Sequence, residues 1–202
     1  MAISRYDSGQ FRVVVIGVST GGLAALKSLF GALSADFPLP VLVVSHIAPD
    51  AGDGLAVLLD STAAIRVKEA EEEEMIKSAT VYLAPANYHL LLERDGRLAL
   101  SVDPAVNFAR PSVDVLFESA AQAYGAGVIG IILTGAGSDG SHGLQAIKQR
   151  GGCAIVQDPA DAEMEAMPHN ALLLTTVDYV EPLARIPDLL QRLVGGWRTH
   201  EY

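Results

Sequence analysis

Short apolar runs alternate with segments of helical periodicity along most of the chain. Residues 13–16 read Val-Val-Val-Ile without a polar residue between them, as expected for a strand that is covered on both faces. Apolar residues between 23 and 33 then recur at i, i+3, i+7 and i+10, which places them on one helix face. Similar patterns predict strands at 13–16, 41–44, 65–68, 80–84, 128–133 and 153–156, and helices at 23–33, after 52, at 113–124, around 144–147 and at 183–193. This order predicts an α/β fold with a doubly wound, mostly parallel sheet and helices on both faces.

One segment departs from the alternation of strand and helix. Asp95-Gly96 favours a tight turn between two short strands. After it, Leu98, Leu100 and Val102 alternate with polar or small residues. We therefore expect a half-buried antiparallel hairpin that extends the sheet.

Composition limits the classes of partner. The 14 basic and 24 acidic residues give a net charge of −10, which disfavours binding to the phosphate backbone of nucleic acids. No repeat, low-complexity tract or linker divides the chain. We expect residues 1–202 to form a single domain with its core at about 12–194.

The sequence carries no signal for export or for membrane insertion. The apolar stretch at 126–133 is much shorter than the roughly 20 residues of a membrane span. Residues 1–10 lack a basic segment followed by an apolar one. We expect a cytoplasmic protein that does not insert into membranes.

Polar residues follow three predicted strands at their carboxyl ends, where open α/β sheets bind ligands. Ser19 lies in Gly-Val-Ser-Thr-Gly-Gly (17–22), His46 follows the second strand, and Asp139 lies in Thr-Gly-Ala-Gly-Ser-Asp-Gly (134–140). A hydroxyl, an imidazole and a carboxylate are the groups of a serine hydrolase. In that hypothesis Ser19 is the nucleophile, His46 takes its proton, and Asp139 orients the imidazole.

Backbone amides near Ser19 are candidates for an oxyanion hole. The neighbouring glycines permit a sharp turn from strand to helix, and the free amides of the helix start can face a developing negative charge. The Thr20 amide is the first candidate, and the amide of Ala136, between two glycines, is the second. This chemistry needs no cofactor, and the lack of HExxH and CxxC motifs argues against a metal site.

Each of these residues also fits a purely structural interpretation. Ser19 is compatible with a helix N-cap, Asp139 with the N-cap of the helix that contains Leu144, and His46 with a hydrogen-bonded strand end. The glycine-rich segment lacks the lysine of a phosphate-binding loop, because Leu23 stands there. Surface or structural roles are expected for His89, His142, His169 and His200.

Five blocks of sequence carry a family resemblance. They are Ile-Gly-Val-Ser-Thr-Gly-Gly (16–22), Ser-His-Ile-Ala-Pro (45–49), Tyr-Leu-Ala-Pro-Ala (82–86), Arg-Pro-Ser-Val-Asp-Val-Leu-Phe (110–117) and Ile-Leu-Thr-Gly-Ala-Gly-Ser-Asp-Gly (132–140). In this order and spacing they resemble the catalytic domain of the CheB-type chemotaxis protein-glutamate methylesterases. The resemblance implies hydrolysis of glutamate γ-methyl esters on the cytoplasmic helices of methyl-accepting chemotaxis receptors. It also implies deamidation of receptor glutamines by the same acyl chemistry.

The resemblance assigns roles to particular residues. The family's triad falls on the three strand-end residues chosen above, and its oxyanion amides fall on Thr20 and Ala136. The family commonly has Met where Ala136 stands, a change that keeps the backbone donor. Arg110 falls in a block that lines the substrate cleft in this interpretation, and it is equally suited to brace a neighbouring loop.

Regulation and rival functions stay open at this level. Well-known members of the family carry an N-terminal receiver domain, whereas only about ten residues precede the first predicted strand here. We therefore expect constitutive activity or control by a regulatory partner in trans. One alternative function is a catalytically silent module that binds receptors or a chemosensory partner through the same cleft. Another is an esterase or acyltransferase for small molecules.

Overall fold

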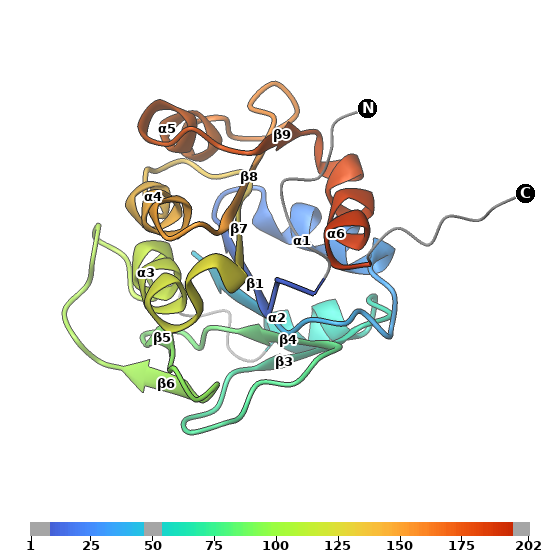
Figure 1. The fold of residues 1–202 in the computed structure, drawn as a ribbon, viewed down its shortest axis with the longest axis vertical. Coiled ribbons are helices and arrows are strands. Elements are labelled where there is room, and N and C mark those ends of the chain that lie inside the picture. Colours follow the sequence, from blue (N-terminus) through green and yellow to red (C-terminus); the bar gives the residue numbers. More distant parts are fainter. Residues whose placement is uncertain (1–8, 47–53, 196–202) are drawn as a thin grey trace, which may run out of the picture.

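The structure is a computed structural model that describes residues 9–46 and 54–195 of the 202-residue chain. Its central strands are β1 (Val13–Val18), β2 (Val41–Ser45), β3 (Arg66–Glu69), β4 (Thr80–Leu83), β7 (Val128–Ile132), β8 (Cys153–Gln157) and β9 (Tyr179–Glu181). They form one seven-stranded sheet in the order β3-β4-β2-β1-β7-β8-β9, and all neighbours run parallel (Figure 1). The predicted doubly wound parallel sheet is confirmed.

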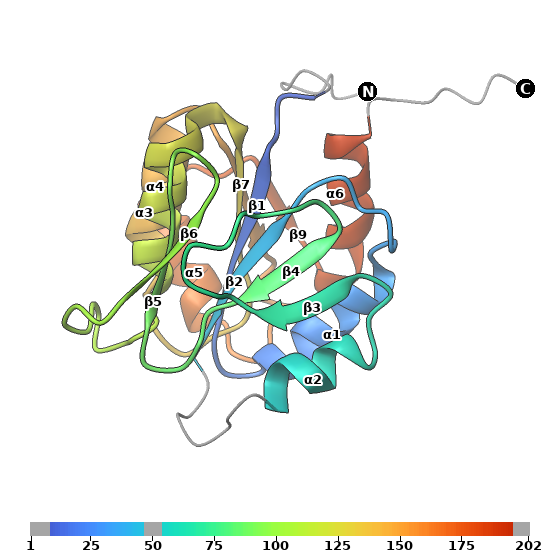
Figure 2. The same ribbon diagram turned by 90° about the horizontal axis from the view of Figure 1, so that it is seen from below.

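Helices cover both faces of this sheet. One face carries α1 (Gly22–Ala32), α2 (Gly54–Asp60) and α6 (Ile186–Val194), and the other carries α3 (Val113–Tyr124), α4 (Ser141–Gln149) and α5 (Ala166–Leu174) (Figures 1 and 2). All six residues of β1 are therefore buried, which accounts for its unbroken apolar run. Within the described residues, every helix is too short or too polar to cross a bilayer.

The predicted hairpin consists of β5 (His89–Leu92) and β6 (Leu98–Ser101). It forms a separate two-stranded sheet that packs beside α3 instead of adding strands to the large sheet (Figure 2). The Leu92 amide donates to Ser119 Oγ of α3 at 3.1 Å, and Leu90 and Leu98 are buried in the same apolar cluster as α3. The hairpin thus buries its apolar face against a helix.

Two elements have no clear signal in the sequence. In α5 the apolar residues follow no single face, because Met167 is buried whereas Leu173 is 74% exposed. The strand β9 has only three residues, and its central Val180 is exposed at the edge of the sheet. Periodicity needs a longer run with one buried face, so neither element was predicted.

The chain reverses its direction of winding at β1. From β1 it passes through α1 to β2 on one side, whereas β7 joins β1 on the other side much later in the sequence. The carboxyl ends of β2, β1 and β7 therefore lie next to one another, with Val18 beside Ser45 and Gly17 beside Ile132. A topological switch point of this kind opens a crevice for ligands.

Candidate active site

Ser19 occupies the turn between β1 and α1. Its amide donates to the Thr134 carbonyl at 3.0 Å, and its own carbonyl accepts from the Gly22 amide at 2.8 Å. The residue that caps α1 is Gly21, with a φ of 80°, and no side chain of a described residue caps this helix. Ser19 is therefore not the N-cap, and its backbone bonds tie the turn to the segment after β7.

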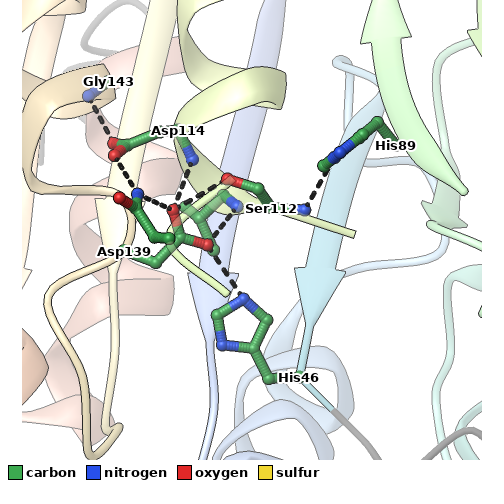
Figure 3. Close-up of polar contacts among 8 residues, drawn as sticks. His46, His89, Ser112, Asp114, Asp139 and Gly143 are labelled. Atoms are coloured by element: carbon green, nitrogen blue, oxygen red, sulfur yellow. Dashed lines mark hydrogen bonds and ion pairs between the residues drawn. The ribbon is translucent and has the colours of Figure 1, made fainter. Parts of the chain in front are cut away.

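His46 follows β2 at the same edge of the sheet. Its amide donates to the Val18 carbonyl at 3.1 Å, which holds the backbone beside the end of β1. Its imidazole Nε2 lies 2.9 Å from Asp139 Oδ2, a contact between residues 93 positions apart (Figure 3). This orientation leaves Nδ1 as the ring nitrogen that is available to exchange a proton with Ser19. Among the described residues the serine hydroxyl makes no hydrogen bond to this ring, a contact that catalytic groups often form only with the substrate in place.

Asp139 accepts hydrogen bonds from the start of α3. Its Oδ2 accepts from the Val113 amide at 2.6 Å, and its Oδ1 accepts from the Asp114 amide at 3.1 Å and from Ser112 Oγ at 2.8 Å (Figure 3). The carboxylate therefore satisfies the N-terminus of α3. The alternative that Asp139 caps the helix containing Leu144 is not seen, because Gly140 caps α4.

These donors set the charge of Asp139. Burial acts to raise the pKa of this carboxyl, but hydrogen bonds outweigh burial and lower the pKa to about 2. The donors are the side chains of His46, Asn107 and Ser112 and the amide of Val113. Asp139 is thus a carboxylate at neutral pH, as a group that stabilises an imidazolium must be.

A second carboxylate, Asp114, lies beside Asp139. Its Oδ1 accepts from the Gly143 amide at 2.6 Å, and its Oδ2 accepts from Asn107 Nδ2 at 2.7 Å. The same Asn107 Nδ2 also donates to Asp139 Oδ1 at 2.9 Å, so one amide group bridges the two acids. Burial raises the pKa of Asp114, and the neighbouring charge of Asp139 adds to this effect.

His89 supports the site from the hairpin. Only 1% of this residue is exposed. Its Nδ1 accepts from the Ser112 amide at 3.2 Å, so the proton of the neutral ring lies on Nε2, which donates to the Pro104 carbonyl at 3.2 Å (Figure 3). His89 therefore has the structural role that was expected for it, and it fixes the residue whose hydroxyl binds Asp139.

The predicted oxyanion amides have no acceptor in the part of the chain that the structure describes. Neither the Thr20 nor the Ala136 amide donates to a described residue, whereas the amide of Gly135, the residue before Ala136, donates to the Met164 carbonyl at 3.0 Å. Thr134 holds this region together, because its Oγ1 donates to the Thr20 carbonyl and accepts from the Met164 amide, both at 2.9 Å.

A substitution at Gly135 tests how tightly this loop must pack against Ser19. A Cβ atom at Gly135 would lie 2.5 Å from Met167 Sδ and 2.9 Å from Ser19 Cβ. We expect Gly135→Ala to lower kcat about 10- to 100-fold by displacing the serine, and to lower the free energy of unfolding by about 1–3 kcal/mol. Ester turnover and urea denaturation measure the two effects.

Gly137→Ala is the matched control, since it lies on the other side of Ala136. A Cβ there would meet only the Asp139 amide nitrogen, at 4.0 Å. Activity close to that of the wild type is expected. Equal losses in the two variants would show that general flexibility of the loop, and not the packing on Ser19, is required.

Two hollows of about 720 Å³ each meet at Ser19 and His46. One is walled by α1 and α2, and the other by residues 107–111 and 136–139. Arg110 borders the second hollow, and its Nη1 donates to the carbonyls of Val102 at 2.7 Å and Asp103 at 3.1 Å. Both suggested roles of Arg110, as a cleft residue and as a loop brace, are compatible with this position.

The residues that surround Asp139 have no local signal in the sequence. Ser112 and Asp114 lie in the block 110–117, but their hydrogen bonds to Asp139 cross 27 and 25 residues. Asn107 lies in a loop and reaches across 32 residues. No local pattern marks such contacts, since they depend on where α3 begins relative to the segment after β7.

Comparisons with known proteins identify relatives over most of the chain. Residues 14–190 match the protein-family model described as CheB methylesterase. A protein of Leptospira interrogans, named "Putative protein-glutamate methylesterase/protein-glutamine glutaminase", is 48% identical over 183 residues, which cover 91% of this chain and 95% of that protein. A "Protein-glutamate methylesterase/protein-glutamine glutaminase" of Trichodesmium erythraeum is 39% identical over 92% of this chain, which spans only 54% of its length.

A solved structure agrees with these relatives. The crystal structure of the Thermotoga maritima CheB methylesterase catalytic domain matches with a TM-score of 0.87 and 38% sequence identity. The match covers 91% of this chain and 99% of the Thermotoga chain. The likeness therefore extends over most of the fold.

Proposed function

Because the chain belongs to the CheB methylesterase family, we propose that it is a serine hydrolase that removes methyl groups from glutamate γ-methyl esters of methyl-accepting chemotaxis receptors. The observation that carries this proposal is the His46–Asp139 pair, 2.9 Å apart, in a hollow that Ser19 also lines. A hydroxyl beside an imidazole that a buried carboxylate orients is the arrangement of nucleophilic acyl transfer.

In the first half of the reaction Ser19 is acylated. Its Oγ attacks the γ-carbonyl carbon of the ester while His46 Nδ1 takes the hydroxyl proton. The negative charge moves to the former carbonyl oxygen, where the amides of Thr20 and Ala136 stabilise it. The bond to the methoxy oxygen then breaks, the imidazolium protonates methoxide, and methanol leaves a glutamyl–Ser19 ester.

In the second half water replaces the serine. His46 takes a proton from a water molecule that attacks the glutamyl–Ser19 carbonyl, and it returns a proton to Ser19 Oγ as the ester bond breaks. The products are the glutamate side chain and the free enzyme. Asp139 stays ionised throughout, because its hydrogen bonds lower its pKa to about 2 after burial has acted to raise it, and it stabilises the imidazolium.

We also propose that the protein deamidates glutamine side chains at the same site. The names of the Leptospira and Trichodesmium relatives combine a methylesterase with a protein-glutamine glutaminase. The acyl chemistry is unchanged, with ammonia as the leaving group in place of methanol. Since the methylated helices of these receptors lie in the cytoplasm, the proposal places the protein there.

Methanol release from a methylated receptor cytoplasmic fragment tests this function. Ammonia release from the fragment with glutamine at the same positions tests the second activity. We expect methanol from the methylated fragment and ammonia from the glutamine form. Turnover of small esters without turnover of the fragment would indicate a small-molecule esterase instead, and binding of the fragment without any release would indicate a silent binding module.

A further inference from the structure

Residues 106–109 form a strained turn beside the candidate site. Val106 and Ala109 close it with two backbone hydrogen bonds, of 3.1 Å from the Val106 amide and 2.9 Å from the Ala109 amide. Its central residues, Asn107 and Phe108, have φ angles of 51° and 61°. A tight hairpin turn with positive φ at both centres favours glycine at the second of them. An aromatic residue there holds an unfavourable backbone conformation.

Phe108 gains no packing within the described chain to offset this strain. Its relative exposure is 106%, whereas the next most exposed large apolar residue of the described chain, Leu173, is at 74%. A fully exposed phenylalanine in a strained turn does not stabilise the fold. Backbone strain of this kind clusters at functional sites, where the surrounding structure maintains it.

The turn is held firmly by its neighbours. Asn107 Nδ2 donates to Asp139 Oδ1 at 2.9 Å and to Asp114 Oδ2 at 2.7 Å, so the turn is fixed to the carboxylate that contacts His46. Arg110 braces the other side through its two carbonyl contacts at Val102 and Asp103. Phe108 is therefore presented from a preorganised turn.

Phe108 borders the hollow that also contains Ser19, His46 and Ala136. A side chain that reaches Ser19 from a protein substrate brings its flanking residues over the rim of this hollow. Exposed aromatic residues on rigid supports are frequent anchors of protein interfaces, because they bury a large apolar area and lose little conformational entropy.

We infer that Phe108 is a substrate-docking residue that packs against apolar side chains flanking the methylated glutamate. The inference rests on the proposed function, which supplies a protein as the substrate. A small ester has no flanking residues, so Phe108 contributes to the turnover of protein substrate alone.

Two substrates separate this role from an effect on the chemistry. For Phe108→Ala, kcat/KM for the methylated receptor fragment is expected to fall about tenfold or more, whereas kcat/KM for the γ-methyl ester of N-acetylglutamate stays at the wild-type value. Phe108→Tyr keeps the ring and is expected to retain most of the receptor turnover. Leu173→Ala, which removes an exposed apolar side chain from α5, is the matched control and should leave kcat/KM unchanged for both substrates.

Phe108→Gly gives an independent readout. Glycine adopts a positive φ without strain, so this variant is expected to raise Tm while receptor turnover falls as in Phe108→Ala. If a Phe108 variant is more stable and loses turnover of the protein substrate alone, a damaged fold cannot explain the loss.

A binding measurement tests the docking role of Phe108 independently of the proposed chemistry. Affinity for the fragment, measured in a Ser19→Ala background, should weaken when Phe108→Ala is added, even if no methanol is ever released. Unchanged affinity and unchanged receptor turnover would overturn the docking role. Equal loss on the small ester would show that Phe108 acts on the site itself. Absence of turnover in the wild type, with the affinity effect intact, would contradict the proposed function alone.

Discussion

Ser19→Ala is expected to lower kcat about 10⁴- to 10⁶-fold while the protein folds as the wild type does. The hydroxyl is the proposed nucleophile, and no other group in the proposed mechanism forms the acyl intermediate. The fold should be unaffected, because the hydrogen bonds of Ser19 to other described residues come from its backbone, through its amide to Thr134 and through its carbonyl to Gly22. Methanol release and ester hydrolysis measure the loss, and thermal unfolding checks the fold.

Ser138→Ala is the matched control for this experiment. Ser138 borders the same hollow, and its backbone carbonyl accepts from the Ser141 amide at 3.2 Å, a bond that alanine preserves. Turnover near the wild-type value is expected for it. Retained hydrolysis in Ser19→Ala would contradict the assignment of the nucleophile and would mean that a water activated by His46, or another hydroxyl, attacks the ester.

Asp139→Asn is expected to reduce both turnover and stability. An asparagine NH₂ group cannot accept a hydrogen bond, so in either orientation it faces a donor, such as the Val113 amide at Oδ2 or Ser112 Oγ at Oδ1. It also removes the charge that holds the imidazolium of His46. We expect kcat to fall by about 10⁴-fold. Turnover of the receptor fragment and of the small ester should fall together.

The stability loss of Asp139→Asn should depend on pH. Hydrogen bonds from His46 and the start of α3 overcome the effect of burial and lower the pKa of Asp139 from 3.8 to about 2. The ionised carboxylate therefore contributes about 2 kcal/mol to the free energy of unfolding at neutral pH. Because the folded pKa is the lower one, this contribution is complete above pH 4 and is lost as the pH falls toward 2.

Urea denaturation at pH 7, 5 and 3 measures this difference. The difference in free energy of unfolding between the wild type and Asp139→Asn should be constant from pH 7 to 5 and smaller at pH 3. Asp36→Asn, at an exposed position after α1, controls for a change of one charge and should show no such difference. A difference in free energy of unfolding that is independent of pH would mean that the loss of stability comes from side-chain geometry and not from the charge of Asp139.

Sequence patterns alone predict the parallel sheet and the edge that carries the candidate site. Unbroken apolar runs such as 13–16 are strong signals, because a strand buried on both faces consists mostly of apolar residues. Ser19, His46 and Asp139 are candidates from the sequence because parallel strands end at one edge, so their positions after strands imply that they lie close together. The pairing of His46 with Asp139 then follows from β2, β1 and β7 being neighbours.

Local elements with weak periodicity were decided by tertiary packing. The hairpin β5–β6 was predicted, but its place on α3 depends on apolar contacts that no turn residue encodes. The short edge strand β9 and the helix α5 form because β8 and α4 offer them surfaces, and their own sequences show no regular face.

The surroundings of Asp139 depend on how distant segments pack in the folded protein. Its carboxylate binds the start of α3 instead of capping α4, because the segment after β7 passes the N-terminus of α3. Asn107 and Ser112 reach Asp139 across 32 and 27 residues, and the exposure of Phe108 depends on the turn that Asn107 fixes. Sequence patterns report on neighbours along the chain and on the face of one element. The charge of Asp139 and the presentation of Phe108 arise from hydrogen bonds between distant segments, which exist only once the chain has folded.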